Sequence, residues 1–261
     1  MTEHIQVRKD LPSGTILINR PERCNALTPR LVNELQTAIH DLHGEKKVRG
    51  VILTGAGNSF CAGTDLLHLH EQMQCPDPES FWQEEFPDFQ ALLESILHFP
   101  KPIVAAVDGA VRGTGLALML ACDYIVATES STFALPEVRR GLIPGFAAPL
   151  LSRRCNAGFT NRMIMTGNSV DAEHAIKESL IDEQVKSDLI WARAQQLVGE
   201  FDAAAPTSLQ LSRQLLNQTI SEAMFTQLSI GAANSAAARS TEDARKGVEA
   251  FVNKSDVNWF D

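Results

Sequence analysis

The sequence predicts an α/β fold, in which a mainly parallel sheet with crossover helices is followed by a helical C-terminal region. Short apolar runs typical of buried strands alternate with amphipathic helical patterns up to about residue 166. Beyond that point the helical patterns follow one another without strands between them. The length of 261 residues and a hydrophobic content of 44% suit one large globular core with a smaller appendage.

The first elements are a strand, a helix and a second strand. The run "GTILINRPE" predicts a strand that ends before Pro21. A helix is expected over residues 28–44, because Thr28 is a good N-cap, Pro29 suits the first helical position and Gly44 suits the end. The nearly continuous apolar run "VRGVILTGAG" predicts a strand buried on both faces.

The middle of the chain begins with a polar segment. Residues 72–88 contain three prolines and are expected to form a loop or an irregular insert. A helix "FQALLESILHF", a strand "KPIVAAVDG" and a strand with a turn "CDYIVATESSTFALPE" should follow. The later helices are expected at "SVDAEHAIKESLID", "LIWARAQQLVGEF", "SLQLSRQLLNQT" and "STEDARKGVEAFVNK".

Composition excludes several classes of function. A net charge of −9 argues against broad nucleic-acid binding, which needs a basic face. The five cysteines are scattered without zinc-type spacing, which favours reduced thiols and no metal site. His68 and His70 are two residues apart and would diverge on a helix, so a metal pair is not expected there. Since the first residues are polar and no apolar stretch reaches about 18 residues, we expect a cytoplasmic protein without a membrane partner.

Two glycine-containing turns carry the main functional signal. They are "TGAGNSFCAGTDL" and "DGAVRGTGLALML", each after a predicted strand. Neither matches the dinucleotide-binding pattern G-x-G-x-x-G, and neither carries the lysine of a P-loop. Two free backbone N–H groups at such turns could converge on one point as an oxyanion hole. Plain connecting turns are the alternative at this point.

An ordered set of motifs points to a family. These are "NRPERCNAL", "VILTGAGNSFCAGTDL", "KPIVAAVDGAVRGTGLALMLACDYIVAT", "STFALPEVRRGLIPG" and "AFVNK". Their order and spacing resemble the crotonase superfamily, which includes enoyl-CoA hydratases and isomerases, over nearly the whole chain. The resemblance implies a spiral of repeated ββα units over residues 1–195. It also implies a helical region over residues 196–261 for trimerisation and for closure of the CoA pocket.

The same resemblance implies the ligand and the site. The substrate would be an acyl-CoA thioester, with no further cofactor, and the assembly a homotrimer or a dimer of trimers. Ala62 and Thr114 would form the oxyanion hole through their backbone N–H groups. The residues expected to bind the substrate or CoA are Arg23, Ala26, Gly63, Asp65, Leu66, Gly113, Pro136, Phe251 and Lys254. For Arg23 and Lys254, solvated surface charge is the alternative.

The sequence departs from the family's hydratases at one acid. Hydratases carry two glutamates, of which one is present here as Glu137 while the other position is Ala117. One carboxylate can remove a proton from C2 and return it at C4, so this pattern favours Δ3 to Δ2 enoyl-CoA isomerisation. The dienoyl-isomerase variant is disfavoured because its aspartate position is Gly145 here. Bulky Phe146 should make the adjacent wall dry, which would raise the pKa of Glu137.

Two other functions stay open from sequence alone. A hydratase or another crotonase-type lyase would need a second acid, for which Glu84, Glu85 or Asp88 of the polar insert are the candidates. A catalytically weakened acyl-CoA-binding protein would explain Ala117, although the retained Glu137 opposes it.

Overall fold

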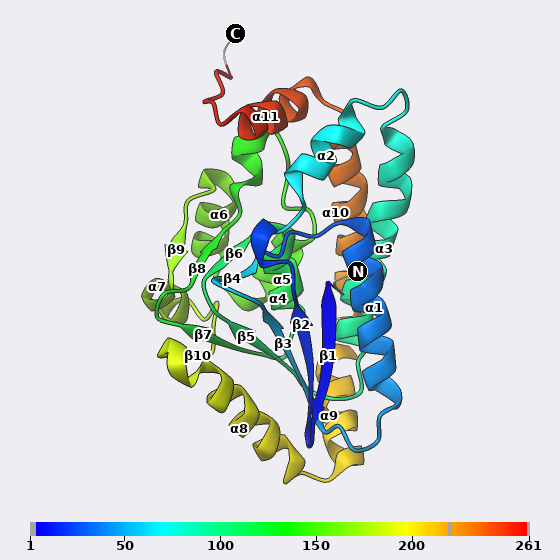
Figure 1. The fold of residues 1–261 in the computed structure, drawn as a ribbon, viewed down its shortest axis with the longest axis vertical. Coiled ribbons are helices and arrows are strands. Elements are labelled where there is room, and N and C mark those ends of the chain that lie inside the picture. Colours follow the sequence, from blue (N-terminus) through cyan, green and yellow to red (C-terminus); the bar gives the residue numbers. More distant parts are fainter. Residues whose placement is uncertain (1–3, 219–220, 260–261) are drawn as a thin grey trace.

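The chain forms a spiral of two sheets surrounded by helices, described by a computed structural model over residues 4–218 and 221–259 (Figure 1). The strands are β1 (Ile5–Asp10), β2 (Ser13–Ile18), β3 (Gly50–Gly55), β4 (Ser59–Cys61), β5 (Ile103–Val107), β6 (Ala110–Arg112), β7 (Tyr124–Thr128), β8 (Thr132–Ala134), β9 (Val170–Asp171) and β10 (Glu183–Val185). The α-helices are α1 (Pro29–Gly44), α2 (Leu66–Met73), α3 (Glu79–Leu97), α4 (Thr114–Leu120), α5 (Ala147–Arg154), α6 (Ala157–Thr166), α7 (Ala172–Lys177), α8 (Ile190–Asp202), α9 (Pro206–Gln218), α10 (Ser221–Arg239) and α11 (Glu242–Asn253). Short 3-10 helices are η1 (Pro21–Arg23), η2 (Pro136–Arg140) and η3 (Ser187–Leu189).

Each turn of the spiral adds one strand to each sheet and then a helix. The larger sheet has the order β1-β2-β3-β5-β7-β10 and the smaller one β4-β6-β8-β9. Pairing from β2 through β10 is parallel in the larger sheet, and β1 joins its edge antiparallel. The units β3-β4-α2, β5-β6-α4 and β7-β8 followed by α5 are the repeats of the spiral. The expected α/β class and ββα spiral are confirmed.

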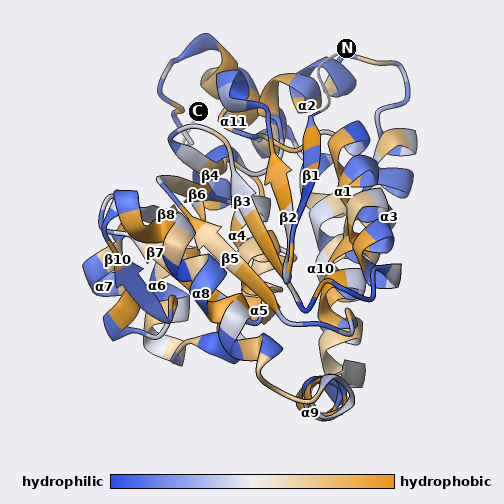
Figure 2. Ribbon diagram, turned by 60° about the horizontal axis from the view of Figure 1, so that its bottom comes forward, coloured by the Kyte–Doolittle hydropathy of each residue, from blue (hydrophilic) through white to orange (hydrophobic). Residues whose placement is uncertain are grey.

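The central strands of the larger sheet are hydrophobic (Figure 2), and their side chains are buried on both faces, as the sequence predicts. Side chains alternate along a strand, so Val51 and Leu53 of β3 join the main core. Ile52, between them, points to the opposite face and packs in a second cluster with Leu197 and Val198 of α8. The larger sheet is therefore covered by helices on both sides.

Helix α1 begins and ends where the sequence indicates. The Thr28 hydroxyl accepts a hydrogen bond from the Leu31 N–H at 3.3 Å, and Pro29 occupies the first turn. Leu31, Leu35 and Leu42 are buried on the face that meets the core. This helix confirms the prediction over residues 28–44.

The expected loop over residues 72–88 is wrong for most of its length. Helix α3 begins at Glu79 and runs to Leu97 through Pro87. Trp82, Phe86 and Phe89 recur at helical spacing and are buried, whereas Pro87 is exposed. The apolar stripe therefore outweighs the missing N–H of one proline on the solvent side.

The division expected at residue 195 falls inside helix α8. Ala194 and Leu197, on either side of that boundary, pack against the same face of the larger sheet, so α8 belongs to the core. The helical region that follows consists of α9, α10 and α11. Helix α10 packs on α3 and α5, and α11 packs on α2 and η2. Among the described residues, no helix combines the length and apolar character needed to cross a bilayer.

Candidate active site

A cavity of about 520 Å³ lies between the two glycine turns, η2 and the C-terminal helices. Its walls bring together segments from Arg23 to Phe251, more than 200 residues apart in the chain. Predicted site residues that line it are Arg23, Ala26, Ala62, Asp65, Leu66, Gly113, Thr114, Pro136, Glu137 and Phe251. The structure thus assembles most of the predicted residues around one space.

The two glycine turns pack directly against each other. Gly63 has a φ of +82°, and a Cβ there would lie 2.6 Å from the Arg112 carbonyl oxygen and 3.0 Å from the Thr114 nitrogen. Glycine is required because any side chain would push the turns apart. Gly63 does not line the cavity, so its role in this chain is to let the turns approach.

Backbone N–H groups differ in availability between the two turns. Thr114 is the first residue of α4, where N–H groups point out of the helix without an intrahelical acceptor. The Ala62 N–H, in contrast, donates to the Cys24 carbonyl oxygen at 3.0 Å. This bond bears on the expected role of Ala62 in an oxyanion hole. An oxyanion could accept from this N–H only by sharing the donor with the Cys24 carbonyl or by displacing that carbonyl.

The segment that supplies Cys24 is held in an unusual backbone conformation. Cys24 and Asn25 have φ values of +50° and +58°. The buried Asn25 amide accepts from the Arg20 N–H at 2.9 Å and donates to the Ala56 and Ser59 carbonyls at 2.9 and 2.7 Å. Asn25 therefore fixes the loop that lines the cavity mouth with Arg23 and Cys24.

Glu137 places a poorly solvated carboxyl group against the second turn. It sits in η2, and burial raises its pKa to about 7, partly offset by its own backbone N–H. Its Oε2 atom is buried without a hydrogen-bond partner among the described residues. Phe146, which is 2% exposed, lines the same cavity and packs against Phe89 with ring centroids 5.1 Å apart. A carboxyl group in such surroundings is suited to exchanging a proton near neutral pH.

Ala117 lies inside the core. It is completely buried in α4 and is part of the main hydrophobic cluster. It is not among the residues that line the cavity around Glu137. The side chain at this position therefore contributes to the packing of the core and supplies no carboxylate to the cavity.

Asp65 contributes mainly to the architecture of the cavity. Its Oδ2 accepts from Arg20 at 2.7 Å, and its Oδ1 caps α2 by accepting from the Leu67 and His68 N–H groups. Burial raises the pKa of Asp65, but the hydrogen bonds from Arg20 and the backbone outweigh that effect and leave the pKa lowered. Asp65 therefore joins the first-turn loop to α2 as a charged anchor.

Of the two predicted C-terminal residues, Phe251 and Lys254, only the first lines the cavity. Phe251 lines it, and the Arg140 guanidinium lies 4.7 Å from the Phe251 ring centroid. Lys254 ends α11 in a left-handed conformation, is exposed and does not line this chain's cavity. In a single chain, Lys254 therefore does not contribute to the wall of this cavity.

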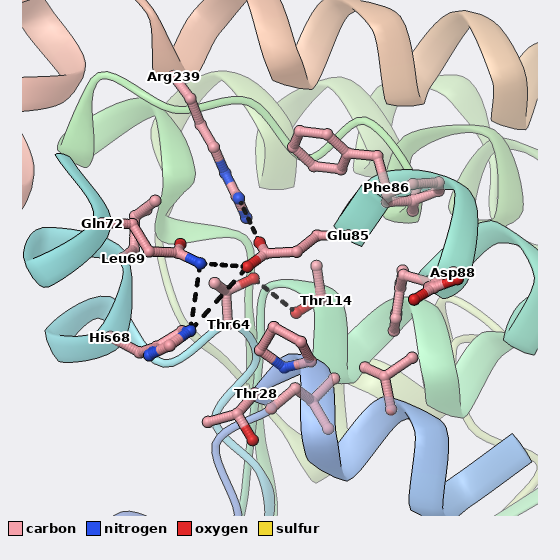
Figure 3. Close-up of a pocket in the computed structure, with 15 residues that line it drawn as sticks. Thr28, Thr64, His68, Leu69, Gln72, Glu85, Phe86, Asp88, Thr114 and Arg239 are labelled. Carbon is pink, nitrogen blue, oxygen red and sulfur yellow. Dashed lines mark hydrogen bonds and ion pairs between the residues drawn. The ribbon is translucent and has the colours of Figure 1, made fainter. Parts of the chain in front are cut away.

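A smaller cavity of about 50 Å³ adjoins the first one and contains a polar cluster (Figure 3). Arg239 Nη1 lies 2.9 Å from Glu85 Oε2, and the Glu85 carboxylate also accepts from the Gln72 amide. The hydroxyls of Thr64 and Thr114 are 3.2 Å apart and line both cavities. Of the acids considered as replacements, Glu85 and Asp88 line the smaller cavity, whereas Glu84 is exposed.

Sequence patterns do not single out Arg140 or Arg239. Arg140 is one of two consecutive arginines, and Arg239 ends an alanine-rich helix. Arg140 reaches the cavity with η2, three residues after Glu137, whereas Arg239 reaches it because α10 folds back onto α3 and α5. A long-range contact of this kind has no local periodicity that could reveal it.

Comparison with known proteins agrees with this geometry. A family model described as "Enoyl-CoA hydratase/isomerase" matches residues 14–261. The chain belongs to this family. It is therefore a crotonase-superfamily member, and its fold is that of an acyl-CoA enzyme.

Individual relatives share the whole architecture. The 2,3-dehydroadipyl-CoA hydratase of Escherichia coli is 32% identical over 244 residues, covering 92% of this chain and 91% of the relative. The 1,2-epoxyphenylacetyl-CoA isomerase of the same organism is 30% identical and covers 92% of each chain. A crystal structure of an enoyl-CoA hydratase from Mycobacterium avium has a TM-score of 0.85 at 29% identity, covering 99% of this chain and 100% of that one. Among similar curated relatives, names of hydratases are more frequent than names of isomerases.

Proposed function

We propose that this enzyme shifts a double bond in an enoyl-CoA from the Δ3 to the Δ2 position, with Glu137 as the proton shuttle. The ionised carboxylate takes a proton from C2, the thioester carbonyl becomes an enolate, and the same carboxyl returns the proton at C4. One proton moves and no other reactant is consumed. The buried carboxyl of Glu137, whose Oε2 atom has no partner among the described residues, carries this proposal.

Among the described residues, no second unpaired carboxylate lines the larger cavity, which favours isomerisation over hydration. Addition of water requires one group to orient the water and another to deliver a proton to the neighbouring carbon. Ala117 lies in the core, and the Glu85 carboxylate is held by Arg239 and Gln72 in the adjoining cavity. A carboxylate that is paired with a buried cation is a poor proton donor.

The enolate oxygen would be stabilised at the glycine turns. Thr114 supplies an N–H at the start of α4, where the helix dipole favours negative charge. Ala62 would be the second donor if its N–H swings from Cys24 or is shared between two acceptors. Removal of one such donor costs about 10²–10³ in rate.

CoA would lie across the mouth of the larger cavity. Arg23 and Arg140 are cations at its lining, and Phe251 offers an apolar face there. Lys254 would complete this site from a neighbouring subunit in a homotrimer. Leu211, Leu215 and Leu216 of α9 are exposed apolar side chains that such an assembly would cover.

Hydration is the second candidate, and the names of the relatives favour it. In that case Glu85 would have to leave Arg239 and act beside Glu137. The two reactions are separated by a paired assay of a 3-enoyl-CoA and a 2-enoyl-CoA of the same chain length. Each substrate is tested with the wild type, with Glu137→Gln and with Glu129→Gln as an exposed control.

The expected result is conversion of the 3-enoyl-CoA alone, lowered by about 10²–10⁴ in Glu137→Gln and unchanged in the control. Hydration of the 2-enoyl-CoA as the main reaction would overturn the isomerase proposal. Loss of that hydration in Glu85→Gln would then identify Glu85 as the second acid. Binding of acyl-CoA without either reaction would instead indicate a binding protein.

A further inference from the structure

The smaller cavity continues the larger one beyond the reacting position. Both spaces are lined by Thr64, Phe86, Thr114, Phe146 and Arg239, so they meet at the second glycine turn. An acyl chain whose thioester lies at Thr114 would therefore direct its far end toward the smaller cavity. This step rests on the function proposed above.

A buried ion pair lies in the smaller cavity. The side chains of Arg239 and Glu85 are only 9% and 15% exposed, and their closest atoms are 2.9 Å apart. The guanidinium carbon lies 4.4 Å from the Phe86 ring centroid, so one face of the cation is covered. An arginine has five N–H donors, of which one meets Glu85 here. The cation can therefore serve a further acceptor in the cavity.

Gln72 adds a second polar group that is incompletely satisfied. It is 6% exposed and lines the smaller cavity. Its Nε2 must face Glu85, because a carboxylate can only accept, and the same nitrogen lies 3.2 Å from His68 Nε2. The amide orientation is thereby determined, and Gln72 Oε1 is left buried without a partner among the described residues.

The charge of this cluster indicates what it can accommodate. Arg239 and Glu85 cancel each other and Asp88 also lines this cavity, so a carboxylate on the ligand would add to the negative charge in a buried place. A plain methyl end would leave donors and acceptors unpaired, at a cost in binding. A neutral oxygen group, either hydroxyl or carbonyl, meets the Arg239 donors without adding charge. About 50 Å³ is enough for such a group, since one water needs about 10–15 Å³.

We propose that the acyl chain of the substrate carries a neutral oxygen function near its far end, recognised by the Arg239–Glu85–Gln72 cluster. The selectivity is thus for an oxygenated acyl-CoA over the simple alkyl chain of equal length. A terminal carboxylate is disfavoured by Glu85.

The experiment measures dissociation constants of saturated acyl-CoA thioesters, which bind but cannot react. At six- and eight-carbon lengths, four ends are compared: methyl, terminal hydroxyl, terminal methyl ketone and terminal carboxylate. For the hydroxyl or the ketone we expect binding about tenfold tighter than for the methyl at one of these lengths. The hydroxyl and ketone arms together show whether a donor on the ligand is needed besides an acceptor.

Two variants test the cluster itself. Replacement of the pair in Glu85→Met/Arg239→Met removes both charges of the pair and keeps the site packed, and should abolish the preference for oxygenated ends. Glu85→Gln leaves Arg239 unbalanced, so the carboxylate end should gain about tenfold in affinity. Glu84→Gln, on the exposed side of the same helix, is the matched control and should change neither. Circular dichroism and thermal unfolding check that each variant is folded.

Each outcome bears on a separate proposal. This inference is overturned if both oxygenated ends bind no more tightly than the methyl end at both chain lengths. Binding of all four esters in that case would still support the acyl-CoA function. Tightest binding of the carboxylate by the wild type also overturns it, because the charge balance would then be wrong. Failure of every ester to bind overturns the proposed function as well.

Discussion

The Glu137 carboxylate lies directly against the backbone of Gly113, so a side chain at position 113 would displace it. A Cβ on residue 113 would lie 3.0 Å from Glu137 Oε1, and the backbone there has a φ of +54° and a ψ of −126°. The glycine therefore allows the carboxylate to lie against the turn whose next N–H belongs to Thr114. The proposed proton shuttle and the proposed oxyanion donor thus meet at one backbone conformation.

The first prediction concerns this contact. Gly113→Ala should destabilise the fold by about 1–3 kcal/mol because an L side chain is strained at that φ. It should also lower kcat by about 10²-fold, since the Glu137 carboxylate must move. Gly199→Ala, in α8 with open space around it, is the control and should stabilise by up to about 1 kcal/mol. Chemical denaturation and steady-state kinetics give both quantities, and wild-type activity in Gly113→Ala would contradict this account of the turn.

The second prediction follows from the raised pKa of Glu137. Its carboxyl must be ionised to accept a proton from C2, and burial brings its pKa to about 7. The value of kcat/KM should therefore fall about tenfold for each pH unit below that pKa and level off above it. A profile recorded between pH 5 and pH 9 checks this. A rate that stays constant from pH 5 to pH 8 would mean that another group removes the proton.

The third prediction is the effect of the same group on stability. The folded-state pKa of Glu137 lies above the usual glutamate value of 4.5, so the folded protein binds more protons between pH 4.5 and 7 and its stability falls as pH rises through that range. Ionised Glu137 should cost up to about 3 kcal/mol above that range. Glu137→Gln removes this dependence. The difference in the free energy of unfolding, variant minus wild type, should thus be more positive at pH 8.5 than at pH 4.5, which means that the substitution stabilises the fold more at the higher pH. The opposite trend would show that Glu137 is stabilised as an anion.

The fourth prediction concerns the Arg20–Asp65 pair. Asp65→Asn removes a charged hydrogen bond of 2.7 Å between largely buried groups and should cost about 1.5–3 kcal/mol at pH 7. Since the pKa of Asp65 is lowered in the fold, that stability is present above the unfolded-state pKa of about 3.8 and is lost as pH falls below it. Glu173→Gln breaks an exposed pair with Lys177 as the control and should cost less than about 0.5 kcal/mol. Urea unfolding at pH 7 and pH 3 measures both variants. If Asp65→Asn and Glu173→Gln lowered the free energy of unfolding equally at pH 7, burial would add nothing to the Arg20–Asp65 interaction.

Local sequence determined the features that depend on neighbouring residues. The cap and apolar face of α1, the two-sided burial of β3 and β5, and the glycine turns all follow from short-range patterns. The replacement of a carboxylate by Ala117 is also visible in the sequence, because it is one position in an ordered motif. These features depend on periodicity and residue type, which a chain carries without its fold.

Tertiary structure decided which groups meet in space. Three features depend on how distant segments pack. They are the exposed position of Pro87 in α3, the hydrogen bond from the Ala62 N–H to Cys24, and the contact between Arg239 and Glu85. Burial of Glu137, and with it the raised pKa, likewise comes from walls supplied by several elements. Desolvation and hydrogen-bond partnership are properties of the packed molecule, so no local pattern contains them.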